Sequence, residues 1–144
     1  MLKRILASHA PAAVILVRLM VGAVFLSEGI QKFLLPDAVG AGRFAKIGFE
    51  SPEVVAQFVA CFEIACGSLV LLGLLTRLAV IPLIVIMLTA IYTTKFEIFQ
   101  QDGFWKMAHE ARTDWSMLLG SVFLLIVGAG PWSADAYWTR NRTP

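Results

Sequence analysis

The sequence predicts an all-α integral membrane protein, a single domain built as a bundle of four transmembrane helices. Hydrophobic residues make up 58% of its 144 residues and charged residues only 15%, whereas soluble domains average about 45–50% and about 25%. The mean hydropathy is +0.77. A soluble bundle of this length could not hide so much apolar surface from water. Lipid is therefore the expected solvent.

Four apolar runs carry this prediction, and each approaches the roughly 20 residues that a helix needs to cross hydrocarbon. They cover about residues 11–35, 54–75, 78–97 and 113–130 of one domain, residues 1–144. The basic N-terminus followed by an apolar run imitates a signal peptide. That run is too long for a secretory segment and contains Arg18, so we expect a retained first helix.

Turn and capping residues mark where the later helices begin and end. Ser51-Pro52-Glu53 is typical of a helix start with Ser51 as its cap. Thr76-Arg77 leaves so short a connection that the second and third helices must be antiparallel neighbours. Thr113 or Asp114 is the expected cap of the fourth helix.

The positive charges outside the apolar runs decide the predicted orientation. With four spans both termini lie on one side, and each side then carries five basic residues. They are Lys3, Arg4, Arg77, Arg140 and Arg142 on the terminal side, and Arg43, Lys46, Lys95, Lys106 and Arg112 on the other. The terminal-side residues are concentrated in shorter loops, and the first helix often dominates, so we expect both termini in the cytoplasm.

Four ionisable residues, Arg18, Glu28, Lys32 and Glu63, lie within the predicted spans. A charge costs about 2.5–3.5 kcal/mol at the centre of the membrane on insertion scales, so each should face protein or water. Glu28 and Lys32 are spaced i,i+4 in the favourable order. Glu63 has no partner within one turn of its own helix, and it shares a face with Gly67, which allows close approach of a neighbouring helix.

Two interpretations of these four residues remain open at this stage. In the first, they form a polar intramembrane pocket for a small molecule or a proton. In the second, they neutralise one another and only fix helix packing. Glu63 is the best single candidate for a functional group.

Charged residues also gather at the entry to the fourth helix. His109, Glu110, Arg112 and Asp114 are expected to form the rim of a pocket mouth. We expect no metal site there, since only one histidine is nearby.

The two cysteines are not expected to form a redox pair. Cys61 and Cys66 lie five residues apart, which separates them by roughly 140° around a helix. They therefore cannot easily pair, and we expect both to be buried apolar fillers.

Three motifs resemble those of the DoxX family of small bacterial membrane proteins. The first helix carries an R-x-x-x-G-x-x-F-x-x-x-G-x-x-K stripe, the second an F-E-x-x-x-G stretch followed by L-G-L-L-T-R, and the chain closes with G-x-G-x-x-S-x-D. The matching residues are Arg18, Gly22, Phe25, Gly29 and Lys32; Phe62, Glu63, Gly67, Leu72, Gly73, Thr76 and Arg77; and Gly128, Gly130, Ser133 and Asp135. Cys66 departs from the family by replacing a common glycine.

The resemblance implies a bacterial inner-membrane protein whose relatives include the membrane subunit of a thiosulfate:quinone oxidoreductase. The expected function is thus a subunit of a quinone-linked redox complex, with the lipid bilayer, a protein partner or a second copy as partners and no nucleic acid. A quinone is the possible cofactor, since the sequence carries no haem-ligand pattern or dinucleotide loop of its own. The alternative is a non-catalytic membrane anchor or assembly module.

Overall fold

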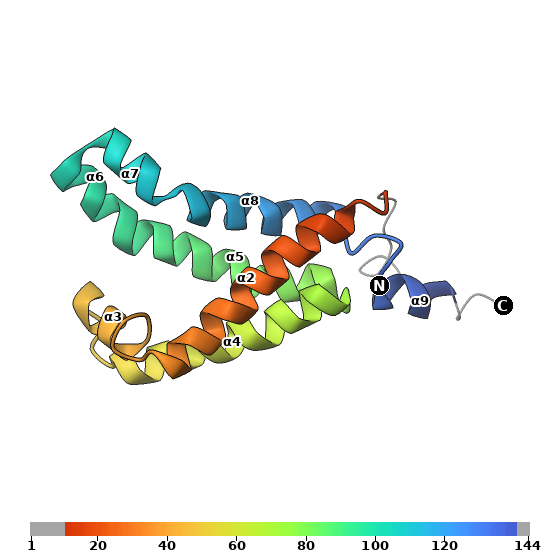
Figure 1. Ribbon diagram of the computed structural model, residues 1–144, viewed down its shortest axis with the longest axis horizontal. Helices are drawn as coiled ribbons and strands as arrows, with labels where there is room; N and C mark the ends of the chain where they lie inside the picture. The colour runs from red at the N-terminus through yellow and green to blue at the C-terminus, as the bar shows by residue number, and fades with distance from the viewer. Residues whose placement is uncertain (1–10, 141–144) are drawn as a thin grey trace.

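The computed structural model of the protein describes residues 11–140, which form helices and turns without a strand (Figure 1). The helices are α2 (Val14–Leu34), α3 (Ala41–Ile47), α4 (Pro52–Leu72), α5 (Thr76–Ala90), the π-helix η1 (Ile91–Lys95), α6 (Phe96–Asp102), α7 (Phe104–Glu110), α8 (Arg112–Val127) and α9 (Ala134–Arg140). The start of α2 and α9 lie at one end of the molecule, and α3, α6 and α7 lie at the other.

Three helical stretches among the described residues are long and apolar enough to cross a membrane. They are α2, α4 and the continuous stretch Thr76–Asp102, which joins α5, η1 and α6. Large apolar side chains cover their outer surface, such as Leu16 at 68% exposure and Phe58 at 63%, as expected for helices that face lipid. The all-α class is confirmed, and the three stretches are candidate spans at the positions of the first three predicted ones. The fourth span stays a prediction, because α8 has 16 residues.

Glycines allow α2 and α4 to pack closely. A Cβ atom built on Gly22 would lie 2.9 Å from the carbonyl oxygen of Gly67, and one built on Gly67 would lie 2.8 Å from the backbone nitrogen of Leu26. Backbone atoms of the two helices are thus in contact at these positions, as is common for small residues between transmembrane helices. The close approach predicted at Gly67 is confirmed.

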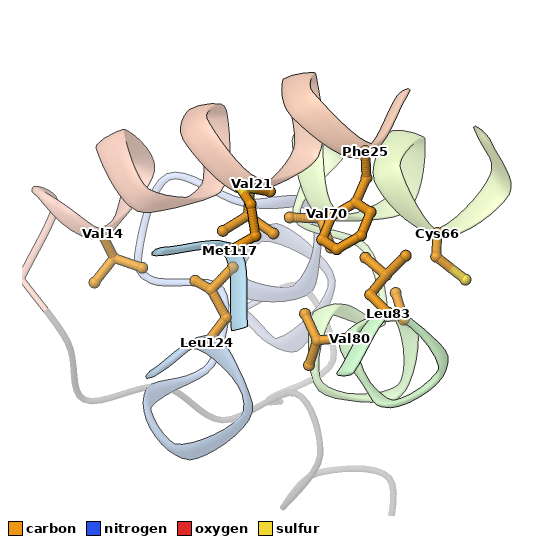
Figure 2. Close-up of a cluster of buried hydrophobic side chains, with 10 residues drawn as sticks. Val14, Val21, Phe25, Cys66, Val70, Val80, Leu83, Met117 and Leu124 are labelled. Atoms are coloured by element: carbon orange, nitrogen blue, oxygen red, sulfur yellow. The ribbon is translucent and has the colours of Figure 1, made fainter. Parts of the chain in front are cut away.

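Side chains from α2, α4, α5 and α8 converge on one apolar core (Figure 2). Val21 and Phe25 of α2, Val70 of α4, Leu83 of α5 and Leu124 of α8 are each exposed by 1% or less. Neighbouring pairs of these helices pack directly, α2 on α4, α4 on α5, α5 on α8 and α2 on α8. The antiparallel arrangement of the second and third spans follows from the tight turn at Gly73, which adopts a positive φ of 68°.

Several predicted details of the connections are wrong. The four predicted spans leave out the short helices α3, α7 and α9. Ser51 does precede a helix that begins at Pro52, but its side chain makes no capping hydrogen bond. The helix expected to be capped by Thr113 or Asp114 already begins at Arg112. The helices α3, α7 and α9 lie outside the long apolar runs, so hydropathy alone gave no sign of them, whereas α6 continues the third run.

Candidate functional site

The close packing of α2 on α4 brings Lys32 and Glu63 together. The Nζ atom of Lys32 lies 2.7 Å from Oε2 of Glu63, and these side chains are only 10% and 3% exposed. Glu28 lies on the outside of the pair, with Oε2 3.9 Å from Lys32 Nζ and 43% of its side chain exposed. Three of the four predicted pocket residues therefore meet, and Glu63 finds its partner on the neighbouring helix.

Gly29 explains why this pair can form. A Cβ atom at Gly29 would lie 2.8 Å from the carbonyl oxygen of Ala60 and 3.0 Å from Cβ of Glu63. Any larger residue would push the two helices apart at the level of the ion pair. The short distance between the helix backbones is what lets Lys32, one turn further along α2, reach Glu63.

A cavity of about 280 Å³ lies beside the pair, between the end of α2 and the start of α4. Its lining combines Lys32 with apolar and polar side chains, among them Phe33, Pro36, Asp37, Glu53 and Gln57. The cavity thus borders a buried cation on one side and carries carboxylate and amide groups on the other. It provides room for water or for a polar part of a small molecule next to Lys32.

Arg18 lies elsewhere, at the opposite end of α2. Its Nε donates to the Val70 carbonyl at 2.9 Å and its Nη2 to the Leu71 carbonyl at 2.6 Å, which are the last carbonyls of α4. Its Nη1 donates to the carbonyls of Ala129 at 3.2 Å and Trp132 at 2.6 Å. The structure therefore does not bring Arg18 to Lys32 and Glu63, and its guanidinium instead joins α4 to the segment after α8.

Asp135 completes this second cluster, although in the sequence it stood out only as part of the family motif. Its carboxylate accepts hydrogen bonds from the backbone N–H of Leu75 at 2.7 Å and of Thr76 at 3.2 Å. Burial raises the pKa of the Asp135 carboxyl, and it outweighs these hydrogen bonds and the charges of Arg18 and Arg77, which act to lower it. Asp135 thereby holds α9 against the turn between α4 and α5.

The four residues predicted as a pocket rim do not line the cavity beside Lys32. Asp114 Oδ2 pairs with Lys95 Nζ at 3.1 Å, and Arg112 Nη1 donates to the His109 carbonyl at 2.6 Å. His109, Glu110 and Arg112 are exposed at the α7–α8 junction. The Lys95–Asp114 pair was not anticipated, although both residues stood at the ends of neighbouring predicted spans.

Comparisons with known proteins agree with the motifs. The DoxX family model matches residues 13–95, more than half of the chain. The chain belongs to the DoxX family. It is 51% identical over 146 residues to the "Uncharacterized membrane protein Rv3486" of Mycobacterium tuberculosis (strain ATCC 25618 / H37Rv), covering 97% of this chain and 90% of that protein. It is 28% identical over 128 residues to the "Putative oxidoreductase CatD" of Bacillus subtilis (strain 168), covering 89% and 88%. No solved structure matches the chain.

The motif residues of this DoxX protein serve two different places. Gly22, Gly29 and Gly67 bring α2 against α4. Lys32 and Glu63 form the ion pair near one end of that contact. Two other charged motif residues, Arg18 and Asp135, belong to the cluster at the other end.

The cysteines occupy different environments. Both are free, Cys66 is buried and Cys61 is exposed. The expectation that they do not pair with each other is confirmed. The expectation that both are buried is wrong for Cys61, because it lies on the outward face of α4.

Proposed function

We propose that this DoxX protein is a membrane subunit of a quinone-linked oxidoreductase complex, in which Glu63 exchanges protons at the cavity beside Lys32. The polar intramembrane site comprises Glu28, Lys32 and Glu63. Arg18 is left out because its donors are directed to backbone carbonyls at the other end of α2.

The observation that carries this proposal is the buried Lys32–Glu63 pair next to a cavity of about 280 Å³. Ionisable groups within transmembrane helices are rare and costly, and they commonly mark ion or proton pathways. Lys32 lines the cavity and contacts Glu63, which is not itself a lining residue, so in this proposal Lys32 connects Glu63 to whatever occupies the cavity. Glu28, which is more exposed, gives the pair a route to the surrounding solvent or headgroup region.

A quinone fits this cavity in part. Lys32 has three N–H donors, so it can bind Glu63 and still donate to a carbonyl oxygen at the edge of a ring. When bound, a quinone supplies two-electron chemistry that takes up protons. The chain's own residues would then hold the carbonyl edge through Lys32 and keep a proton available at Glu63. The volume of about 280 Å³ lies just below that of typical ligand pockets, about 300–1,000 Å³, so the cavity suits the edge of such a ring.

The family supports a redox role in general terms, because a relative covering most of this chain is named as an oxidoreductase. The proposal assigns the electron donor to a partner protein. Only the proton and quinone parts of the reaction are assigned to this chain.

The test compares the Glu63→Gln variant with the wild-type protein, each produced in cells whose own copy of the gene has been deleted, and uses membranes from those cells. The amide keeps the size and hydrogen bonding of the acid but cannot release a proton. We expect reduction of an added short-chain quinone, with thiosulfate or a dithiol as donor, to fall by about a hundredfold. The thermal stability of the purified variant in detergent should stay close to that of wild type.

Glu97→Gln is the matched control, since Glu97 lies on α6 and contacts Gln101 on its own helix. It should leave quinone reduction unchanged. If Glu63→Gln membranes reduce quinone at the wild-type rate, the proton-exchange role is refuted.

A second candidate function is a non-catalytic anchor or assembly module. The observation in its favour is that Lys32 and Glu63 already neutralise each other at 2.7 Å, as a purely structural ion pair would. This candidate predicts unchanged quinone reduction in Glu63→Gln together with lost stability. The two measurements in the same variant therefore separate the candidates.

The proposal also includes a four-span topology with both termini in the cytoplasm, in which α8 is the fourth span. Reporter fusions after Pro144 and within residues 43–48 should then report opposite compartments, with the C-terminal fusion inside. Two fusions on the same side would show that the number of spans between them is even, contrary to the proposal. If the fusions report opposite compartments but the C-terminal fusion lies outside, only the predicted orientation is refuted.

A further inference from the structure

An apolar hollow of about 600 Å³ is lined by residues of α5, η1, α6, α7 and α8. Its walls include five aromatic side chains: Tyr92, Phe96, Phe99, Phe104 and Trp115. The rings of Tyr92 and Phe96 are stacked, with centroids 6.2 Å apart and an angle of 17° between their planes. These two rings stack on each other, and the aromatic lining as a whole gives the hollow an apolar surface on which a flat ring can pack.

The π-helix η1 shapes one wall of this hollow. Single π-turns within α-helices are uncommon and frequently lie at functional sites. Here the hydroxyl of Thr93 donates to the Thr89 carbonyl at 2.8 Å and that of Thr94 to the Ala90 carbonyl at 2.6 Å. These bonds satisfy carbonyls around the altered turn within a transmembrane stretch, where unpaired backbone groups are costly. The local sequence thus supports the π-turn that places Tyr92 and Lys95 on the hollow.

Lys95 provides the charged group in the lining. Its Nζ lies 3.1 Å from Oδ2 of Asp114, with 11% of the Lys95 side chain and 20% of the Asp114 side chain exposed. The pair is neutral overall, so the hollow does not favour an anion or a cation. An ammonium has three N–H donors, and the contact with Asp114 leaves donors for an uncharged acceptor at the ring's edge.

We propose that this hollow binds a flat, neutral, lipid-soluble ring that carries a carbonyl group, with aromatic side chains on the ring faces and Lys95 donating to the carbonyl. The choice of a quinone as the ring rests on the proposed function, whereas the site itself rests on the hollow and its charge pair. The cavity beside Lys32 is smaller and carries the carboxyl groups of Asp37 and Glu53. The aromatic hollow is thus proposed as a second ring site, separate from the cavity beside Lys32 where the proposed function places the reacting ring edge.

The test measures binding of a naphthoquinone with one isoprene unit to the purified full-length protein in detergent. We expect Trp115→Leu and Lys95→Met each to weaken binding by about tenfold. Trp105→Leu and Lys106→Met are the matched controls, because Trp105 is 83% exposed and neither residue lines the hollow. Both controls should bind the quinone like wild type. A naphthalene with the same side chain but no carbonyls should bind wild type more weakly and be insensitive to Lys95→Met.

Several results would overturn this site. They are no saturable binding to wild type, equal losses in Trp115→Leu and Trp105→Leu, or equal affinity for the ring without carbonyls. Phe99→Ala removes a different aromatic side chain from the lining and should also weaken binding. This second variant keeps the test valid if Trp115→Leu does not fold. If Glu63→Gln weakened quinone binding and Trp115→Leu did not, the measured binding would belong to the cavity beside Lys32 and the site in the hollow would be refuted. Normal binding together with unchanged turnover in Glu63→Gln would refute the proton-exchange role and leave the ring site standing.

Discussion

The two charged clusters of this protein lie near opposite ends of α2 and differ in how their cations are satisfied. Arg18 and Lys32 are 14 residues apart on one helix face, which is roughly 21 Å along the axis. Arg18 donates to four backbone carbonyls from two separate segments. Lys32 forms one close contact with a carboxylate and borders a cavity.

This difference separates a structural arginine from a candidate functional lysine. The carbonyls in the last turn of α4 carry the negative end of its dipole, so the planar guanidinium, with five donors, suits them, although the Val70 carbonyl also accepts from the N–H of Gly73. The four hydrogen bonds of Arg18 within residues 11–140 all go to the backbone, which leaves little that a ligand could change. The Lys32–Glu63 pair instead holds a titratable acid whose cation partner is open to a cavity.

Replacing Arg18 with methionine should have the largest effect. The change removes hydrogen bonds to four carbonyls and takes a positive charge away from buried Asp135. Losing one partner of a buried charged network typically costs about 3–5 kcal/mol. We expect the free energy of unfolding, measured by SDS titration in mixed micelles, to fall by about that amount.

Two further variants sharpen this prediction. Arg18→Lys keeps the charge but cannot reach all four carbonyls, so it should recover only part of the lost stability. Leu16→Met is the control on the same helix, since Leu16 is 68% exposed, and it should be neutral. Stability of Arg18→Met equal to that of Leu16→Met would contradict a structural role for Arg18.

The sequence predicted the elements that depend on long apolar runs and on local helical spacing. Three candidate spans appear within about five residues of the expected bounds, and Gly67 makes the expected close contact. The meeting of Lys32 with Glu63 agrees with the expectation that ionisable residues within the spans face protein or water. Such features are set by composition and helix geometry, which can be read from a single sequence.

Other features depend on contacts between distant segments. Arg18 shares a stripe with Lys32, but its long side chain reaches carbonyls at positions 70, 71, 129 and 132. Helical spacing specifies a face and not such partners. The short helices α3, α6, α7 and α9, and the π-turn, depend on packing and on hydroxyl bonds that hydropathy does not report. The aromatic hollow was not predicted either, because its lining residues come from five different helical segments, among them Trp115 of α8.

A smaller effect is expected at the other cluster, where a double-mutant cycle tests the Lys32–Glu63 pair. Lys32→Met leaves the carboxyl of Glu63 without its partner at 3% exposure, and we expect a loss of about 1–3 kcal/mol in the SDS titration. Adding Glu63→Gln should restore part of that loss, because a neutral amide needs no cation. Lys46→Met, at an exposed position on α3, is the control and should change little.

Additive effects of Lys32→Met and Glu63→Gln would mean that the two groups do not interact in the folded protein. We expect a clear coupling free energy between Lys32 and Glu63 that is smaller than the loss of unfolding free energy in Arg18→Met. Water in the cavity can replace a lost partner of the Lys32–Glu63 pair, whereas Arg18 is surrounded by backbone carbonyls. That result would support the distinction between the two clusters.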